Sequence, residues 1–213
     1  MPTKETFIQA LQELRKLDKE SGNERKFVQT VDLIINLRDF DVKKTSLNIL
    51  VNLPHKLEAK RIAAFLEKKS PVVDTITKEE FEDFKDKKKM KRLVKEYDFF
   101  MASARLMPIV ATTFGRILGP TGKMPSPQLG VLMKEDENTI KELMKKIDTV
   151  TKVRAKEPSI KIAIGKQSNK DEELAENAMA IYNDVYKNLP KQKENLKNVL
   201  IKFTMSKPVK VVV

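Results

Sequence analysis

The sequence predicts an α/β protein of two domains, one discontinuous and the other inserted into it. Both chain ends carry amphipathic helices together with strands in which apolar and polar residues alternate. The middle carries short, wholly apolar strands separated by helices, which is typical of a mainly parallel βαβ sheet. We therefore expect residues 1–57 and 148–213 to form a discontinuous α+β domain and residues 58–147 to form the inserted domain.

The N-terminal part of the discontinuous domain begins with a helix over residues 5–19, because Phe7, Leu11 and Leu14 recur at helical spacing. The period then changes to two, which predicts half-buried strands over residues 27–37 and 47–53.

The C-terminal part is expected to contain a strand at 160–164, a long helix capped by Ser168 or Asn169, and strands at 199–203 and 209–213. Within the strand at 199–203, Val199, Ile201 and Phe203 share one parity and are expected to face the helices. Thr204 then faces outward.

The inserted domain is expected to contain three short strands, at residues 61–65, 71–73 and 98–101, and three helices, at residues 77–95, 103–113 and 138–147. Thr77 and Glu80 form a capping box, which predicts the start of the first of these helices.

Composition excludes several classes of function. The 213 residues include 42 Lys or Arg and 30 Asp or Glu, a net charge of +12, which favours a polyanionic partner. There is no cysteine and one histidine, so disulfides, thiolate metal sites and most histidine chemistry are excluded. No apolar run approaches the about 20 residues of a spanning helix, and the first residues lack a signal-peptide pattern. We expect a soluble intracellular protein.

A glycine- and proline-rich segment over residues 115–127 invites comparison with a phosphate-binding loop. That motif requires Gly where this chain has Ile117 and a hydroxyl where it has Met124, so the nucleotide-site interpretation is disfavoured. One alternative is a surface loop made rigid by its prolines. We favour another: a loop, with Gly119 and Gly122, that presents Arg116 and Lys123 to RNA or to the other domain.

Two further features have ordinary structural interpretations. Residues 85–92 contain six basic side chains, which predicts a solvated helix face, with a secondary RNA contact as the alternative. His55 follows Pro54 at a strand end and is interpreted as a packing or turn residue rather than a metal ligand. The acidic residues, such as Glu79 and Glu172, fall at helix starts beside lysines, so no catalytic constellation is predicted.

Three stretches of the chain resemble one known family. Residues 115–127 read Gly-Arg-Ile-Leu-Gly-Pro-Thr-Gly-Lys-Met-Pro-Ser-Pro, which resembles the signature of the large-subunit ribosomal protein of the L-one stalk. Residues 25–31 resemble the start of that family's first strand, and residues 202–208 resemble its C-terminal segment. The compact length and the sequence of residues 202–208 resemble those of archaeal members. Gly165-Lys166 and residues 97–100 also match, whereas the family has Gly where this chain has Ser206.

The resemblance implies a split α+β sandwich domain and an inserted Rossmann-like three-layer domain. It implies a structural protein of the large subunit, monomeric when free, that binds rRNA at the mobile stalk near the tRNA exit site in the cytoplasmic ribosome. It further implies repression of translation by binding to the mRNA of its own operon, indirect contact with exit-site tRNA, and no cofactor. The alternative is a small Rossmann-type enzyme or nucleotide-binding protein with an RNA-binding domain, which nucleotide turnover would reveal.

The resemblance also implies an RNA site on the split domain. An aromatic ring, small hydroxyls, a flexible apolar side chain and lysines suit structured RNA. For Phe27 and Met205 the alternative is ordinary core packing. The predicted site comprises Lys26, Phe27, Thr30, Lys166, Asn198, Lys202, Thr204, Met205, Ser206 and Lys207.

Overall fold

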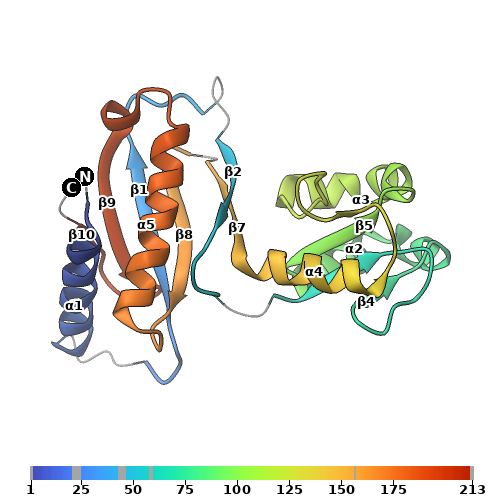
Figure 1. Cartoon of the computed structure of the whole chain (residues 1–213), viewed down its shortest axis with the longest axis horizontal. Coiled ribbons are helices and arrows are strands. Elements are labelled where there is room, and N and C mark those ends of the chain that lie inside the picture. The colour runs from blue at the N-terminus through green and yellow to red at the C-terminus, as the bar shows by residue number, and fades with distance from the viewer. Residues whose placement is uncertain (1, 21–24, 43–46, 58–59, 156, 212–213) are drawn as a thin grey trace. The chain divides into compact units, whose positions relative to one another are not determined.

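The structure of the protein is a computed structural model, which describes residues 2–20, 25–42, 47–57, 60–155 and 157–211 (Figure 1). The chain divides into two compact units. Unit 1 contains Met1–Glu58 and Thr149–Val213, and unit 2 contains Ala59–Asp148.

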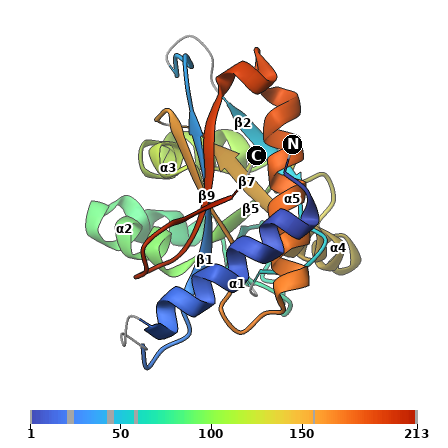
Figure 2. The ribbon, with the colours of Figure 1, turned by 90° about the vertical axis from the view of Figure 1, so that its left-hand side faces the viewer.

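Unit 1 is a two-layer α/β structure. Its main sheet has the order β10-β9-β1-β8, and every neighbouring pair is antiparallel. The four strands are β1 (Thr30–Leu37), β8 (Ser159–Lys166), β9 (Leu196–Phe203) and β10 (Val209–Val211). Helices α1 (Lys4–Glu20) and α5 (Asp171–Asn188) pack against each other and against one face of this sheet (Figure 2). A short ribbon of β2 (Asn48–Asn52) and β7 (Val150–Arg154) completes the unit.

Among the described residues of unit 1, no helix covers the other face of this sheet. Along β1 the buried residues alternate with half-buried ones, so Val31, Leu33 and Ile35 face the helices. The opposite set, which begins with Thr30 and Asp32, faces away from them. The alternation that predicted β1 and β9 therefore also identifies the open face of the sheet.

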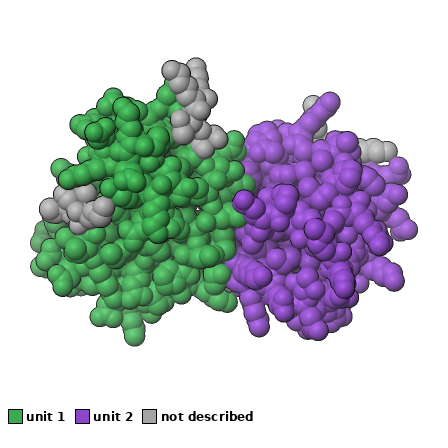
Figure 3. Space-filling view, turned by 45° about the horizontal axis from the view of Figure 1, so that its top comes forward, with its two compact units in different colours: residues 1–58, 149–213 green, residues 59–148 purple. Residues whose placement is uncertain are grey.

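Unit 2, purple in Figure 3, contains a parallel sheet of order β4-β3-β5-β6. Its strands are β3 (Ile62–Phe65), β4 (Asp74–Ile76), β5 (Phe99–Ser103) and β6 (Val131–Leu132). Helices α2 (Lys87–Glu96) and α3 (Met107–Thr121) share one core with Phe65, Phe100 and Phe114. Helix α4 (Glu137–Thr149) buries Ile140 and Ile147 outside that core, so the sheet lies between two helical layers. The expected three-layer arrangement is confirmed.

Three local predictions for unit 2 are wrong. The strand expected at 71–73 lies at Asp74–Ile76. The helix expected over 77–95 is a 3₁₀ helix η1 (Glu79–Lys85) followed by α2, because the Asp86 side chain accepts a hydrogen bond from Lys88 N at 3.0 Å and starts a new helix. Of the predicted capping box, the bond from Thr77 N to Glu80 Oε2 is present at 3.2 Å.

The third wrong prediction for unit 2 concerns the glycine-rich segment, residues 115–127. Helix α3 continues through Gly115 and Gly119 to Thr121, so most of the expected loop is helical. It ends at Gly122, which has φ 76° and caps the helix in the left-handed region that glycine adopts at least cost. Pro120 in the last turn of α3 does not prevent this.

The expected cap of α5 is also wrong. Neither Ser168 nor Asn169 caps the helix; Lys170 is its N-cap residue and makes no side-chain cap bond. Three acidic residues in the first turn of α5 instead stabilise the helix, because their negative charges lie at the positive end of its dipole.

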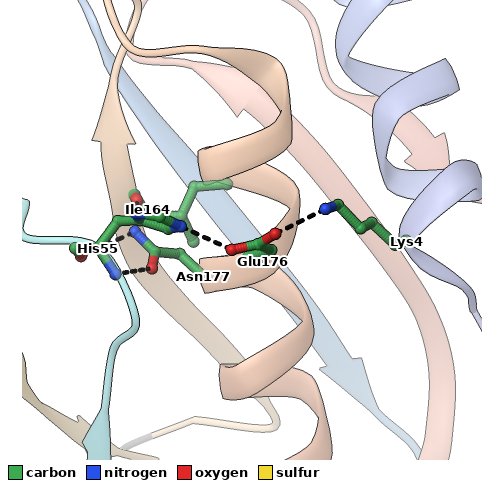
Figure 4. Close-up of polar contacts among 5 residues, drawn as sticks. All are labelled: Lys4, His55, Ile164, Glu176 and Asn177. Carbon is green, nitrogen blue, oxygen red and sulfur yellow. Dashed lines mark hydrogen bonds and ion pairs between the residues drawn. The ribbon is translucent and has the colours of Figure 1, made fainter.

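The segment after β2 is fixed to α5 by a polar network (Figure 4). Asn177, which is fully buried, accepts from His55 N at 3.0 Å and donates to the carbonyl oxygens of His55 and Ile164 at 3.1 and 2.9 Å. The His55 ring lies 2.6 Å from Glu176, whose other oxygen lies 2.6 Å from Lys4 Nζ. His55 is thus a structural residue at the end of the strand.

Candidate nucleic-acid interface

Three segments far apart in sequence meet at one end of the main sheet of unit 1. They are residues 25–30 at the start of β1, residues 165–169 at the end of β8, and residues 203–207 at the end of β9. Because β1 is antiparallel to both neighbours, its first residues lie beside their last ones.

The register places particular residues together. Thr30 pairs with Lys166, and Val31 pairs with Phe203. The carbonyl oxygen of Thr30 accepts hydrogen bonds from Thr204 N at 3.1 Å and from Thr204 Oγ1 at 3.3 Å. The predicted residues Thr30, Lys166 and Thr204 are therefore neighbours.

Gln29 joins all three segments. Its side chain is 1% exposed and accepts a hydrogen bond from Met205 N at 3.1 Å. Its carbonyl oxygen accepts from Gln167 N at 2.8 Å. Gln29 was not among the residues predicted for the RNA site. Its parity matches that of Val31 and Leu33, so alternation could have predicted that it points inward.

Large apolar side chains are exposed at this junction. Phe27 is 56% exposed, Val28 56% and Met205 59%, and they account for three of the five exposed large hydrophobic residues in the described part of the chain. Core packing of Phe27 and Met205 is therefore excluded. Val28 was not predicted. The strand-end surface, as we call it, comprises Lys26, Phe27, Val28, Thr30, Lys166, Thr204, Met205 and Lys207.

A β-bulge between β1 and β8 determines toward which face of the sheet Lys166 points. The register between β1 and β8 shifts between Val31 and Asp32, so Lys166 faces the same side as Thr30. Gly165 is required here by close packing: a Cβ on it would lie 2.4 Å from Leu174 Cδ2 in the fully buried side chain of α5.

Arg15 of α1 holds the loop that follows Lys166. Its guanidinium donates to the carbonyl oxygens of Gln167 and Asn169 at 2.9 and 3.1 Å and to Asp171 Oδ1 at 2.8 Å. These charge-assisted bonds fix the loop in one conformation. Arg15 was also not predicted, because its partners, two backbone carbonyls and the Asp171 carboxylate, lie more than 150 residues away and no motif reveals them.

Ser206 closes the turn after β9. Its Oγ accepts a hydrogen bond from Phe203 N at 2.9 Å, and its own N–H donates to the Phe203 carbonyl oxygen at 3.2 Å. Among the described residues other than glycine, positive φ angles occur at Asp39 and Gln192 and not at Ser206. The backbone here therefore does not require the glycine of the family pattern.

Two predicted residues lie elsewhere on the open face. Asn198 is near the start of β9, opposite Asn36, whose Nδ2 donates to its Oδ1 at 2.7 Å. Lys202 pairs with Asp32 beside the strand-end surface. Burial raises the pKa of Asp32, and the charge of Lys202 partly opposes that rise.

The second group of predicted residues belongs to unit 2. Arg116 and Gly119 are exposed on α3, whereas the Lys123 ammonium donates to the carbonyl oxygens of Val94 and Tyr97 at 2.8 and 2.7 Å. The expectation of a loop presenting Lys123 is wrong, because this amine ties the end of α3 to α2.

The lysine-rich run forms the exposed side of α2. Lys88, Lys89, Lys91 and Arg92 are exposed, as a solvated helix face requires, while the side chains at 85 and 87 lie outside the described residues. Within the described ranges, no three His, Asp or Glu side chains are grouped as a metal site would require. In the same ranges, no helix is long and apolar enough to span a membrane.

The split of unit 1 around unit 2, and the exposed apolar and basic surface at one sheet end, define a two-unit α/β protein built for binding. Residues 17–207 match the model of the Ribosomal protein L1p/L10e family. The chain belongs to this family, and the resemblance noted from the sequence is confirmed. It is accordingly a structural ribosomal protein and not an enzyme, and the family is part of the cytoplasmic ribosome.

Individual relatives agree along nearly the full length. The large ribosomal subunit protein uL1 of Pyrobaculum calidifontis is 35% identical, over 93% of this chain and 92% of its own. The protein of the same name from Thermofilum pendens is 37% identical over 90% and 87%, and that from Methanobrevibacter smithii 35% identical over 97% and 100%. These organisms are archaea, as the style of the C-terminal segment indicated.

Proposed function

We propose that unit 1 binds large-subunit rRNA through the strand-end surface, as a monomer, at the mobile stalk near the tRNA exit site. The observation that carries this proposal is the meeting of Phe27, Thr30, Lys166, Thr204 and Met205 at one sheet end, with both large apolar side chains exposed. Membership of a ribosomal protein family supports RNA as the partner.

The chemistry of this surface suits irregular RNA. Phe27 offers a ring on which an unstacked base can stack, and Met205 offers a flexible apolar contact. The exposed Thr204 hydroxyl can accept a hydrogen bond from a ribose 2′-OH while it donates to Thr30. Lys26 and Lys207 supply phosphate contacts at the edges.

The surface is also held ready for its partner. Gln29 fixes the segment of Met205, and Arg15 fixes the loop after Lys166. A surface ordered before binding loses less conformational entropy when RNA docks, so more of the contact energy appears as affinity.

We propose further that the same surface binds the mRNA of the protein's own operon and so represses its translation. Structured RNA is recognised through shape and backbone contacts, so an mRNA element that folds like the rRNA site would fit the same residues. On the ribosome, the stalk carrying this protein would move with tRNA leaving the exit site, an indirect contact.

A competition experiment between the two RNAs tests both proposals, rRNA binding and mRNA binding at one surface. A labelled transcript of the stalk rRNA is titrated with the full chain, and the 5′ region of the operon mRNA is added as competitor. The two RNAs should exclude each other, and Met205→Ala should weaken both by the same factor. Simultaneous binding of both RNAs would contradict a shared surface, and equal affinity for an unrelated hairpin of the same length would contradict specific rRNA binding.

A further inference from the structure

A pocket lies in unit 1 at the end of the sheet opposite the strand-end surface. It has a volume of about 720 Å³ and lies where η2 (Gln192–Asn195) enters β9. Strand β1 runs from one site toward the other, and its seven steps from Thr30 to Leu37 span about 24 Å at about 3.4 Å per residue. The pocket is therefore separate from the strand-end surface.

The floor of the pocket is aromatic. Tyr182 and Tyr186 lie one turn apart on α5, with ring centroids 6.1 Å apart and planes inclined by 22°. Tyr182 is 2% exposed, whereas Tyr186 is half-buried and offers its ring to the pocket.

The rim of the pocket is basic. Arg38, Lys193 and Lys197 line it with exposed side chains, and Glu194 is the one acidic residue among the described residues of the lining. Asn198 borders the pocket from β9, while its Oδ1 accepts from Asn36 Nδ2 on the open face of the sheet. An anion with hydrogen-bond acceptors is the ligand that this lining favours.

The two loops of the rim are fixed in place. Asn195, 1% exposed, donates through Nδ2 to the carbonyl oxygens of Arg38 and Asp39 at 3.0 and 3.3 Å and accepts from Lys191 N at 2.8 Å. Asp39 at φ 51° and Gln192 at φ 42° are the two described non-glycine residues with positive φ, and both belong to these loops. Strained backbone of this kind persists where the surroundings hold it, often at ligand sites.

We propose that this pocket binds an unpaired nucleotide of single-stranded RNA, as a second RNA site of the protein. The base would stack on Tyr186, and the flanking phosphates would contact Arg38, Lys193 and Lys197. Stacking platforms bordered by cations are the usual means of binding single strands, and the volume lies within the range of ligand pockets. This proposal does not depend on the strand-end surface binding rRNA.

The test uses the full chain and a fluorescently labelled hexa-adenylate, with anisotropy as the readout. Lys197→Ala should weaken binding about fivefold or more, while the matched variant Lys16→Ala, which removes the same charge from exposed α1, should change it less than twofold. Tyr186→Phe, which keeps the ring, should retain affinity, and Tyr186→Leu should lose it. Thr204→Ala should have no effect.

Each other outcome overturns the proposal. If the hexamer does not bind, the pocket is not an RNA site. Equal losses of affinity in Lys197→Ala and Lys16→Ala would show that the basic rim acts only through non-specific charge attraction. A large loss in Thr204→Ala would place the oligonucleotide at the strand-end surface. Adenosine monophosphate binding as tightly as the hexamer would indicate a free-nucleotide site, because one nucleotide cannot bring several phosphates to the three cations.

Discussion

The side-chain carbonyl of Gln29 accepts a hydrogen bond from the backbone N–H of Met205 at 3.1 Å, across 176 positions of sequence. This buried side chain is not itself part of the strand-end surface, yet it holds the backbone of the exposed Met205. The strand-end surface therefore depends on a residue beneath it.

Replacing Gln29 with Leu tests that dependence. The change leaves the Met205 N–H without its partner, which should lower the free energy of unfolding by about 1–3 kcal/mol and weaken rRNA binding several-fold. Urea unfolding measures the first effect and RNA titration the second. The control is Gln128→Leu, at an exposed position of unit 2, which should change neither. An unaltered unfolding free energy for the Gln29 variant would show that the bond fixes nothing.

The contrast between Gln29 and Phe27 indicates how far sequence reasoning reaches. Alternation along 27–37 correctly predicted β1 and its buried face, because a half-buried strand records its environment with a period of two. The exposure of Phe27 could not be predicted in this way, since an aromatic residue at a strand start usually packs inward. The resemblance to a family, not periodicity, selected it.

Unit 1 should fold without unit 2. Asn52 pairs with Val150 at the end of the ribbon, and Leu53 N donates to the Thr149 carbonyl oxygen at 2.8 Å, so a short linker can close the gap left by removing residues 59–148. The shortened protein should unfold cooperatively and keep most of the rRNA affinity. Its circular dichroism and RNA titration give the answer. Stronger binding by isolated unit 2 than by isolated unit 1 would contradict the location of the site.

RNA affinity should fall steeply with salt. Each phosphate that a lysine or arginine neutralises contributes a slope of about 0.7–0.9 in a plot of log affinity against log salt. With about five or six such contacts, affinity should fall by about two to three orders of magnitude between 50 and 200 mM salt. Titrations at four salt concentrations measure the slope. A flat response would mean that the net charge of +12 does not act on RNA.

The Glu176 network should make the stability of unit 1 depend on pH in the acid range. Hydrogen bonding to Lys4, and secondarily to His55, lowers the pKa of Glu176 below its ordinary 4.5. A lowered pKa stabilises the folded state above about pH 4.5, and this stabilisation is lost as the pH falls toward the lowered value. Glu176→Gln should thus unfold at a lower temperature than the parent at pH 6, with the difference shrinking below pH 4.5. A difference that persists unchanged at pH 3 would assign it to packing.

The middle of the chain shows a different limit of the sequence. Strands β3 and β5 were predicted correctly because parallel strands buried on both faces are short apolar runs. Strand β4 was placed three residues too early, and the two-residue β6 was not predicted. Residues 115–121 were misassigned because Gly115, Gly119 and Pro120 each disfavour a helix, whereas burial of Phe114 and Leu118 against the sheet outweighs them. Lys123 was predicted to be presented to RNA or to the other domain. Its two carbonyl partners become neighbours only in the folded chain, so the sequence does not reveal them.

The most direct test of the RNA site compares two exposed methionines. Met205 belongs to the strand-end surface and is 59% exposed, while Met133 of unit 2 is 86% exposed and lies outside it. Replacement of either by Ala should leave the thermal unfolding temperature within about 2 °C of the parent, because exposed side chains contribute little to stability. Titration of a stalk rRNA fragment should then give an affinity at least fivefold weaker for Met205→Ala and unchanged for Met133→Ala. Equal affinities for the two variants would contradict the strand-end surface as the RNA site.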